Sequence, residues 1–311
     1  QYVYDGNSNR ISGTQAGVAI NAQYDDQDRL ITYGSKAYQY TDNGEQKSVT
    51  DSAGGATTSF SYDVFGNTQS IQLSNGSIVK YEVDGFNRRV NRIVNGVVNK
   101  RYLYQSQLQI VAELATNGAL QSQFVYGSKD HVPDYMIRGT TKYKFVTDYL
   151  GSVRLVVNSA TGAIMQQIGY DEFGKVLNDT NPGFQPFGFA GGLYDKDTGL
   201  VRFGARDYDA NTGRWTSKDP ILFAGGDSNF YGYVFNDPIN FIDPMGLSAS
   251  FDLQSAINAT LVGALTGAMD VGQFGLIIPG GVIPGAIIGS VVGGVFGFTI
   301  NAVTQAVGLG I

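Results

Sequence analysis

Few side chains in this 311-residue sequence can do acid–base or nucleophilic chemistry, and aspartate is the main candidate among them. There is no Cys and a single His, His131, which excludes thiol catalysis, a disulfide framework and an ordinary zinc site. Three Asp-Pro pairs occur in the last third of the chain, at Asp219, Asp237 and Asp243. Two carboxylates held close together share a proton, so one can activate water while the other polarises a carbonyl. Asp-Pro is also typical of turns, so the residues alone leave both interpretations open.

Charged residues become scarce after Leu247. Residues 1–247 hold 21 Lys/Arg and 25 Asp/Glu, whereas residues 248–311 hold no Lys, Arg, Glu or His, and only Asp252 and Asp270. Nucleases and group transferases need such groups for proton transfer or charge stabilisation. We therefore expect no enzymatic activity in the C-terminal segment and place a domain boundary after Leu247. The net charge of −6 argues against a nucleic-acid partner, and nothing indicates a metal or an organic cofactor.

The elements before this boundary form a repeat. An aromatic or β-branched residue is followed closely by Asp and then by Gly or Asn, residues that favour tight turns. The segments between the turns alternate in polarity, for example over 77–83 and 99–104, which predicts half-buried strands. One hairpin cannot bury its own face, so we expect neighbouring hairpins to stack into a mainly β fold. The Asp residues of the copies are Asp5, Asp25, Asp42, Asp63, Asp84 and, later, Asp171.

This pattern resembles the YD repeats of RHS proteins, and the resemblance becomes more specific downstream. The matching segments are DYLGSVR at 148–154, GLVRFGARDYD at 199–209, TGRWTSKDP at 212–220, NFYGYVFNDP at 229–238 and FIDPMGL at 241–247. From 186 onwards they resemble the RHS-associated core domain, as in type VI secretion Rhs effectors and Tc toxin C subunits. The resemblance implies a β-sheet that spirals into a hollow shell around a C-terminal polypeptide. We therefore expect YD repeats over 1–185, the core domain over 186–247 and an enclosed tail over 248–311.

The resemblance also implies that the core domain is a single-turnover aspartyl autoprotease. RHS proteins cut after the Leu of a D-P-x-G-L motif, which corresponds here to the bond between Leu247 and Ser248. Carried over, the catalytic carboxylates are Asp219 and Asp243. The matching arginine is Arg206, whose guanidinium would hold one carboxylate ionised or stabilise the oxyanion.

The apolar tail has the small-residue spacing of closely packed helices. Small residues four positions apart line one helical face and let another helix approach closely. The tail therefore predicts a glycine-zippered helical hairpin, with helices over 252–270 and 284–306 and a turn over 272–281. The second helix would be roughly 34 Å long, enough to cross a bilayer core. The zipper residues are Ala259, Gly263, Gly267, Gly281, Gly285, Gly289, Gly293 and Gly297.

Three functions of the tail remain open on the sequence. It could be a membrane-inserting, pore-forming effector, because a soluble domain could hardly coat itself with two charges. It could be a hydrophobic translocation segment ahead of a truncated enzymatic toxin. It could also be a structural plug in a cell-surface RHS protein.

The expected partners follow from the resemblance and from chain length. Fewer than 250 residues cannot close a large shell, and the sequence begins at Gln1 without Met. We therefore expect a fragment or a processed product whose shell continues upstream. The resemblance further implies export from a bacterium, delivery by a secretion spike or Tc toxin subunits, and a cognate immunity protein. The tail would act at the target-cell membrane.

Overall fold

The computed structural model describes residues 2–15, 18–250, 276–278 and 281–283. The chain divides into two units, Gln1–Ser250 and Phe251–Ile311. The described part of the first unit is built from antiparallel strands and three short 3-10 turns, which confirms the expected mainly β fold.

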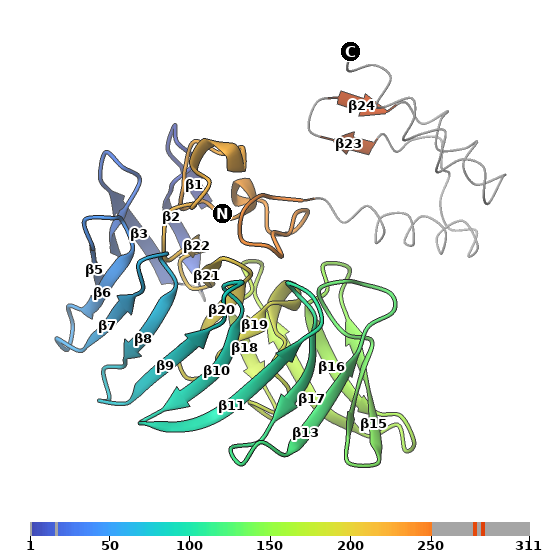
Figure 1. The fold of residues 1–311 in the computed structure, drawn as a ribbon. Helices are drawn as coiled ribbons and strands as arrows, with labels where there is room; N and C mark the ends of the chain where they lie inside the picture. The colour runs from blue at the N-terminus through green and yellow to red at the C-terminus, as the bar shows by residue number, and fades with distance from the viewer. Residues whose placement is uncertain (1, 16–17, 251–275, 279–280, 284–311) are drawn as a thin grey trace. The chain divides into compact units, whose positions relative to one another are not determined.

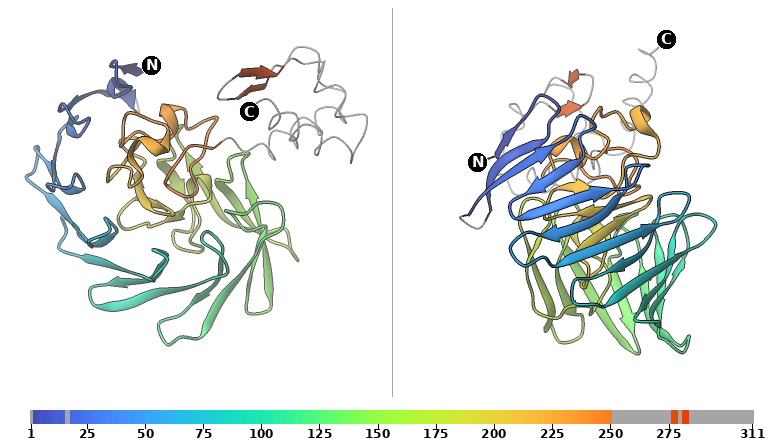
Figure 2. Two further views of the ribbon diagram at one scale, coloured as in Figure 1. Left: turned by 45° about the horizontal axis from the view of Figure 1, so that its top comes forward. Right: turned by 90° about the vertical axis from the view of Figure 1, so that its left-hand side faces the viewer.

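The first 18 strands form one large sheet in which each strand pairs antiparallel with the next. The alternating segments at 77–83 and 99–104 fall in two of these strands, as predicted. The residues that follow this sheet in the chain, 186–247, are called the core segment below. Figure 2 shows the large sheet curving around this segment. The strands (Figure 1) are β1 (Tyr2–Tyr4), β2 (Arg10–Gln15), β3 (Val18–Tyr24), β4 (Leu30–Tyr33), β5 (Lys36–Tyr40), β6 (Gln46–Asp51), β7 (Thr57–Tyr62), β8 (Thr68–Gln72), β9 (Ile78–Val83), β10 (Arg89–Val94), β11 (Val97–Tyr104), β12 (Ile110–Leu114), β13 (Leu120–Val125), β14 (Tyr135–Arg138), β15 (Thr141–Thr147), β16 (Val153–Asn158), β17 (Ile164–Tyr170) and β18 (Val176–Asp179).

The aspartate of each repeat closes its own turn. Oδ1 of Asp63 accepts the N–H groups of Phe65 and Asn67, both at 2.9 Å. A side chain that satisfies two turn amides in this way is an Asx-type cap. In the copy after Tyr40 the capping residue is Thr41, whose hydroxyl accepts the N–H of Glu45, so Asp42 was wrongly placed in the series. The same pair of bonds occurs at Asp5, Asp25, Asp84, Asp148 and Asp171.

The tyrosine of the repeat has a separate role, because it ties its strand to the preceding hairpin. The Tyr62 hydroxyl donates to the Gln46 carbonyl at 2.8 Å. A buried tyrosine needs such a partner for its O–H, and the bond locks one hairpin onto the next. Equivalent bonds join Tyr24 to Arg10, Tyr104 to Arg89, Tyr126 to Ile110 and Tyr170 to Val153.

The core segment forms a second, four-stranded antiparallel sheet with an aromatic centre. The rings of Tyr208 and Tyr233 are 4.3 Å apart, and Trp215 packs edge-on against both. Aromatic pairs of this kind add to the stabilisation from burial itself. The elements of this segment are η1 (Phe189–Gly191), β19 (Leu193–Tyr194), β20 (Leu200–Phe203), β21 (Arg206–Asp209), β22 (Arg214–Trp215), η2 (Leu222–Gly225) and η3 (Val234–Asn236).

Buried ion pairs fix the large sheet onto the core sheet. Arg92 of β10 binds Asp195 through Nε at 2.7 Å, and Arg89 of the same strand binds Asp207 at 3.0 Å. Arg214 of β22 donates to the Asn9 side chain at 2.8 Å. These contacts join residues far apart in the sequence, so the core segment keeps a defined position inside the curve of the sheet.

The described part of the second unit is a hairpin of β23 (Leu276–Ile278) and β24 (Gly281–Ile283). The sequence predicts a turn between two helices here, and Gly281 instead pairs with Ile278 in a strand. Branched residues on both sides of a Pro-Gly pair favour a β-hairpin over helix continuation. The two expected helices and the other zipper residues lie outside the described residues. Within the described part of the chain, no helix has the length and apolar character needed to cross a membrane.

Candidate active site

Arg206, Asp219 and Asp243 meet in one buried cluster. Arg206 begins β21, Asp219 follows β22, and Asp243 lies in the loop after η3. Nη2 of Arg206 is 2.9 Å from Oδ2 of Asp219 and 3.2 Å from Oδ2 of Asp243. All three side chains are at most 8% exposed. The structure therefore brings together the three residues that the sequence analysis selected.

The bond between Leu247 and Ser248 lies in a loop closed by Ile242 and Ser250. The backbones of these two residues exchange hydrogen bonds of 3.0 and 2.7 Å. Inside the loop, Oδ1 of Asp243 accepts the N–H of Leu247 at 3.0 Å. The N–H of Ser248 also acts on this carboxyl. Because this N–H belongs to the Leu247–Ser248 peptide, Asp243 contacts the bond that the motif marks for cleavage.

Two glycines allow this loop to pack directly on the core sheet. A Cβ on Gly246, which has a φ of 63°, would lie 2.3 Å from the Phe203 carbonyl oxygen. A Cβ on Gly204 would lie 2.2 Å from the Met245 carbonyl oxygen. Only glycine fits such close backbone contact. Arg206 completes the contact by donating from Nε to the Gly246 carbonyl at 2.6 Å.

Gly225 lies beside both the second carboxylate and the carbonyl of the marked bond. A Cβ at this position would lie 2.6 Å from Oδ2 of Asp219 and 2.9 Å from the Leu247 carbonyl oxygen. Asp219 and that oxygen therefore face the same small gap. The sequence analysis did not select Gly225. Its only sequence signal is a Gly-Gly pair shortly after the Asp219–Pro220 motif, and that signal is equally typical of any turn.

Burial and charge set the protonation of the cluster. Burial raises the pKa of Asp219 above the ordinary aspartate value, although the Arg206 charge opposes it. Burial also raises the pKa of Asp243, and the neighbouring Asp219 adds to this effect. Burial lowers the pKa of Arg206, with both carboxylates opposing. The Trp215 ring packs against the guanidinium of Arg206 in a cation–π contact, with its ring centre 4.2 Å from Cζ of Arg206.

The cluster borders a cavity of about 20 Å³. The three members of the cluster line this cavity together with Leu247, Ser248 and Asp227. A polar cavity of this size holds about one water molecule. Asp227 accepts the N–H of Asn229 at 2.9 Å. The third Asp-Pro aspartate, Asp237, does not line this cavity and accepts bonds from Asn240.

The large antiparallel sheet of YD repeats, followed by a small four-stranded sheet, defines a YD-repeat shell. The sequence model of the family described as Teneurin YD-shell matches residues 1–239. The chain therefore belongs to the YD-shell family, among the RHS/YD-repeat shell proteins.

Individual relatives match over most of the chain. Teneurin-4 of Mus musculus is 30% identical over 253 residues, covering 77% of this chain and 9% of that protein. The tRNA3(Ser)-specific nuclease WapA of Bacillus spizizenii is 24% identical over 258 residues, covering 79% of this chain and 11% of that protein. The crystal structure of TcdB2-TccC3-Cdc42 aligns with a TM-score of 0.49 at 17% identity, covering 79% of this chain and 17% of that one. The chain thus spans about a tenth of the length of Teneurin-4 and of WapA.

Proposed function

We propose that this chain is a fragment of a bacterial toxin shell that cuts itself once, between Leu247 and Ser248, and so releases the apolar tail. The observation that carries the proposal is the placement of two carboxylates beside one peptide bond. Asp243 contacts the N–H groups of Leu247 and Ser248. Asp219 faces the gap that also holds the Leu247 carbonyl oxygen.

The arrangement supports a general acid–base hydrolysis. Asp219 in its protonated form polarises the Leu247 carbonyl, while ionised Asp243 takes a proton from a water in the cavity. The resulting hydroxide adds to the carbonyl carbon. Asp243 then passes its proton to the Ser248 nitrogen as the C–N bond breaks. The reaction consumes one water and yields a carboxylic acid at Leu247 and an amine at Ser248, whose proton exchange gives a carboxylate and an ammonium group.

Arg206 orients this machinery and limits it to one turnover. Its guanidinium contacts both carboxylates and also holds the Gly246 carbonyl. After cleavage these contacts would retain the new C-terminus at Leu247 in the site. A retained product blocks the entry of a second peptide, so the reaction acts on the chain's own loop.

A mixing experiment tests whether cleavage is intramolecular. A chain carrying Asp243→Asn supplies an intact substrate, and a tenfold excess of wild-type chain supplies the active cluster. We expect the wild-type chain to be cut with a rate that does not depend on its concentration, and the Asp243→Asn chain to stay intact. Cleavage of the Asp243→Asn chain by the wild type would contradict a reaction confined to the chain's own loop.

For the released tail we propose insertion into a lipid bilayer as a pore-forming effector. The support is compositional: residues 248–311 carry only two ionisable side chains, and small residues recur every four positions. Inside lipid, close packing of such faces offsets the cost of glycine in a helix. The shell would keep this surface from water until delivery by a secretion apparatus, and a cognate immunity protein would protect the producer.

Vesicle leakage tests the effector role. The 311-residue chain is added to dye-loaded vesicles of phosphatidylglycerol and phosphatidylethanolamine, at pH 7 and at pH 4. We expect release by the wild type. The matched control carries Gly289→Leu and Gly293→Leu, which block close helix packing and should abolish release. Wild-type protein that releases no dye at either pH would favour a plug instead.

A further inference from the structure

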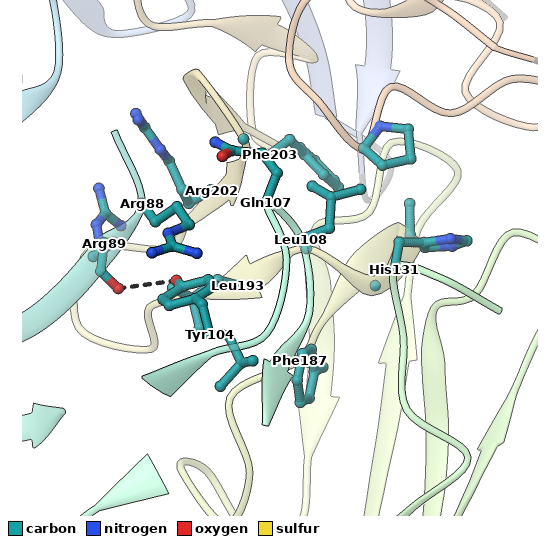
Figure 3. Close-up of a pocket in the computed structure, with 16 residues that line it drawn as sticks. Arg88, Arg89, Tyr104, Gln107, Leu108, His131, Phe187, Leu193, Arg202 and Phe203 are labelled. Carbon is teal, nitrogen blue, oxygen red and sulfur yellow. Dashed lines mark hydrogen bonds between the residues drawn. The ribbon is translucent and has the colours of Figure 1, made fainter. Parts of the chain in front are cut away.

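A second cavity lies between the large sheet and the core sheet (Figure 3). Its volume is about 40 Å³, well above the 10–15 Å³ that one water needs. Arg88 and Arg89 line it from the large sheet, and Arg202 lines it from β20. Pro244 of the cleavage motif also forms part of its wall. None of the residues assigned to hydrolysis lines this cavity.

The arginines of this cavity carry more positive charge than their partners neutralise. Arg89 and Arg202 share the single carboxylate of Asp207, at 3.0 and 3.3 Å. Their side chains are 3% and 5% exposed, so water does not screen them. Arg88 is paired with Asp84 at 2.7 Å. Two guanidinium groups on one carboxylate leave about one buried positive charge without a directly paired carboxylate, which is costly, although the charge of Asp195 also acts on Arg89.

The same two arginines also have unused hydrogen-bond donors. The Nε–H groups of Arg89 and Arg202 are buried, and neither makes a hydrogen bond within the described residues. The other donors of Arg202 bind Asp207 and the Asn67 side chain. Leaving a buried charged donor unpaired costs more than leaving a neutral one unpaired. A ligand that accepts from both Nε–H groups and carries negative charge would remove both costs.

We propose that this cavity is a binding site for a small tetrahedral oxyanion, with inorganic phosphate or sulfate as its ligand. Such an ion offers several acceptor oxygens to planar guanidinium donors, and its charge offsets the excess. Bound there, it would join the two sheets and contact Pro244 of the cleavage loop. The site is independent of the proposed hydrolysis, because its residues take no part in it.

Calorimetric titration of the full chain with sodium phosphate or sodium sulfate tests the site. Titrations run at pH 7 against sodium chloride at matched ionic strength, with thermal unfolding in parallel. We expect a dissociation constant below about 1 mM and a melting temperature at least about 3 °C higher at saturation. Chloride should give neither effect. Heats and melting temperatures indistinguishable from the chloride series would show that the cavity holds water only and would overturn the proposal.

Two variants of Arg202 separate binding from general salt effects. Arg202→Met leaves Asp207 and Arg89 as a neutral pair, so the fold should persist while the phosphate response is lost. Arg202→Lys keeps the charge without an Nε–H group and should bind at least tenfold more weakly. Arg138→Met is the matched control, because Arg138 donates to Ser122 and the Phe184 carbonyl away from this cavity, and it should bind like wild type. An equal phosphate response in Arg202→Met and wild type would contradict the proposed site. If Arg202→Met does not fold, the wild-type titration alone still decides whether phosphate or sulfate binds.

Discussion

Asp219 and Asp243 each direct one carboxylate oxygen to the same nitrogen of Arg206, at 2.9 and 3.2 Å. One cation therefore serves two buried anions. Full ionisation of both carboxyls would leave a negative charge without a partner in a site shielded from water, which is unfavourable. We therefore expect Asp219 and Asp243 to hold one proton between them, which is the proton that a general acid requires.

The rate of self-cleavage should depend on pH in a bell-shaped manner. Burial raises the pKa of both aspartates. At low pH both carboxyls are protonated and no base remains, whereas at high pH both are ionised and no acid remains. We expect the rate to fall about tenfold per pH unit on each outer limb. Time courses between pH 3 and pH 9 measure it, and a rate that keeps rising with pH would exclude the shared proton.

Replacement of Arg206 should affect both cleavage and stability. Arg206→Lys keeps the charge but cannot reach two carboxylates and the Gly246 carbonyl together, so cleavage should slow by about 100-fold. Arg206→Ala leaves two buried carboxyls without a cation and should lower the free energy of unfolding by about 3–5 kcal/mol. Urea titration measures the stability change. Arg29→Lys is the control, because its ion pair with Asp25 is partly exposed and should change stability by less than about 1 kcal/mol. Equal losses in the free energy of unfolding for Arg206→Ala and Arg29→Lys would argue against a special role of Arg206.

A methyl group at Gly225 should separate the acid from the bond. Gly225→Ala would place Cβ between Oδ2 of Asp219 and the Leu247 carbonyl oxygen. The φ of Gly225 lies outside the left-handed region, so the backbone itself should tolerate alanine. We expect slower cleavage and a modest loss in melting temperature, because the new Cβ also crowds the Leu247 backbone oxygen.

The neighbouring Gly226 supplies the matched control for this change. Its φ is 87° and a Cβ there would meet open space, so Gly226→Asn, which tolerates the left-handed region, should cleave at nearly the wild-type rate. Gel time courses at the optimal pH compare the two variants. Cleavage of Gly225→Ala at the wild-type rate would remove Asp219 from the proposed contact with the Leu247 carbonyl.

The contact between Asp207 and its arginines should make the fold sensitive to acid. Burial acts to raise the pKa of Asp207, but the charges of Arg89 and Arg202 outweigh it and hold that pKa below the ordinary aspartate value. A lowered pKa in the folded state contributes stability that is present above about pH 4, the unfolded value, and is lost as pH falls through the folded pKa.

Asp207→Asn should therefore lower the free energy of unfolding at pH 7 by about 3–5 kcal/mol. The loss should shrink towards acid pH, because the wild type then loses the same contribution. Urea titrations at pH 7 and pH 3 measure both effects, with Asp237→Asn as an exposed-segment control. A penalty that is as large at pH 3 as at pH 7 would contradict an ionic origin.

The repeat could be predicted from sequence because its determinants are local. Asp63 caps a turn through amides two and four residues away, and such contacts follow from spacing alone. The Tyr62 bond to the Gln46 carbonyl could not be predicted, because it depends on how one hairpin stacks on the next. Asp42 was misplaced because Thr41 caps as well as aspartate does, so residue type did not decide the register.

The candidate site was only partly accessible to sequence reasoning. Asp219, Asp237 and Asp243 all precede proline, and a turn residue and an acid look alike in such a pair. The RHS resemblance selected two of them, and the structure places those two, but not Asp237, around Arg206. The sequence analysis could not select Gly225, or the unpaired Nε–H groups of Arg89 and Arg202, because their roles arise from tertiary contacts. The predicted helices of the tail lie outside the described residues and stay predictions.

The most direct test of the central claim is the denaturing mass of the purified 311-residue chain after incubation at mildly acidic pH. The wild type and Asp237→Asn should each yield two polypeptides separated between Leu247 and Ser248, whereas Asp219→Asn and Asp243→Asn should stay intact. Each of these last two variants retains a one-to-one pair with Arg206, so both should fold. An intact wild type, or a break that persists in Asp243→Asn, would contradict self-cleavage by this cluster.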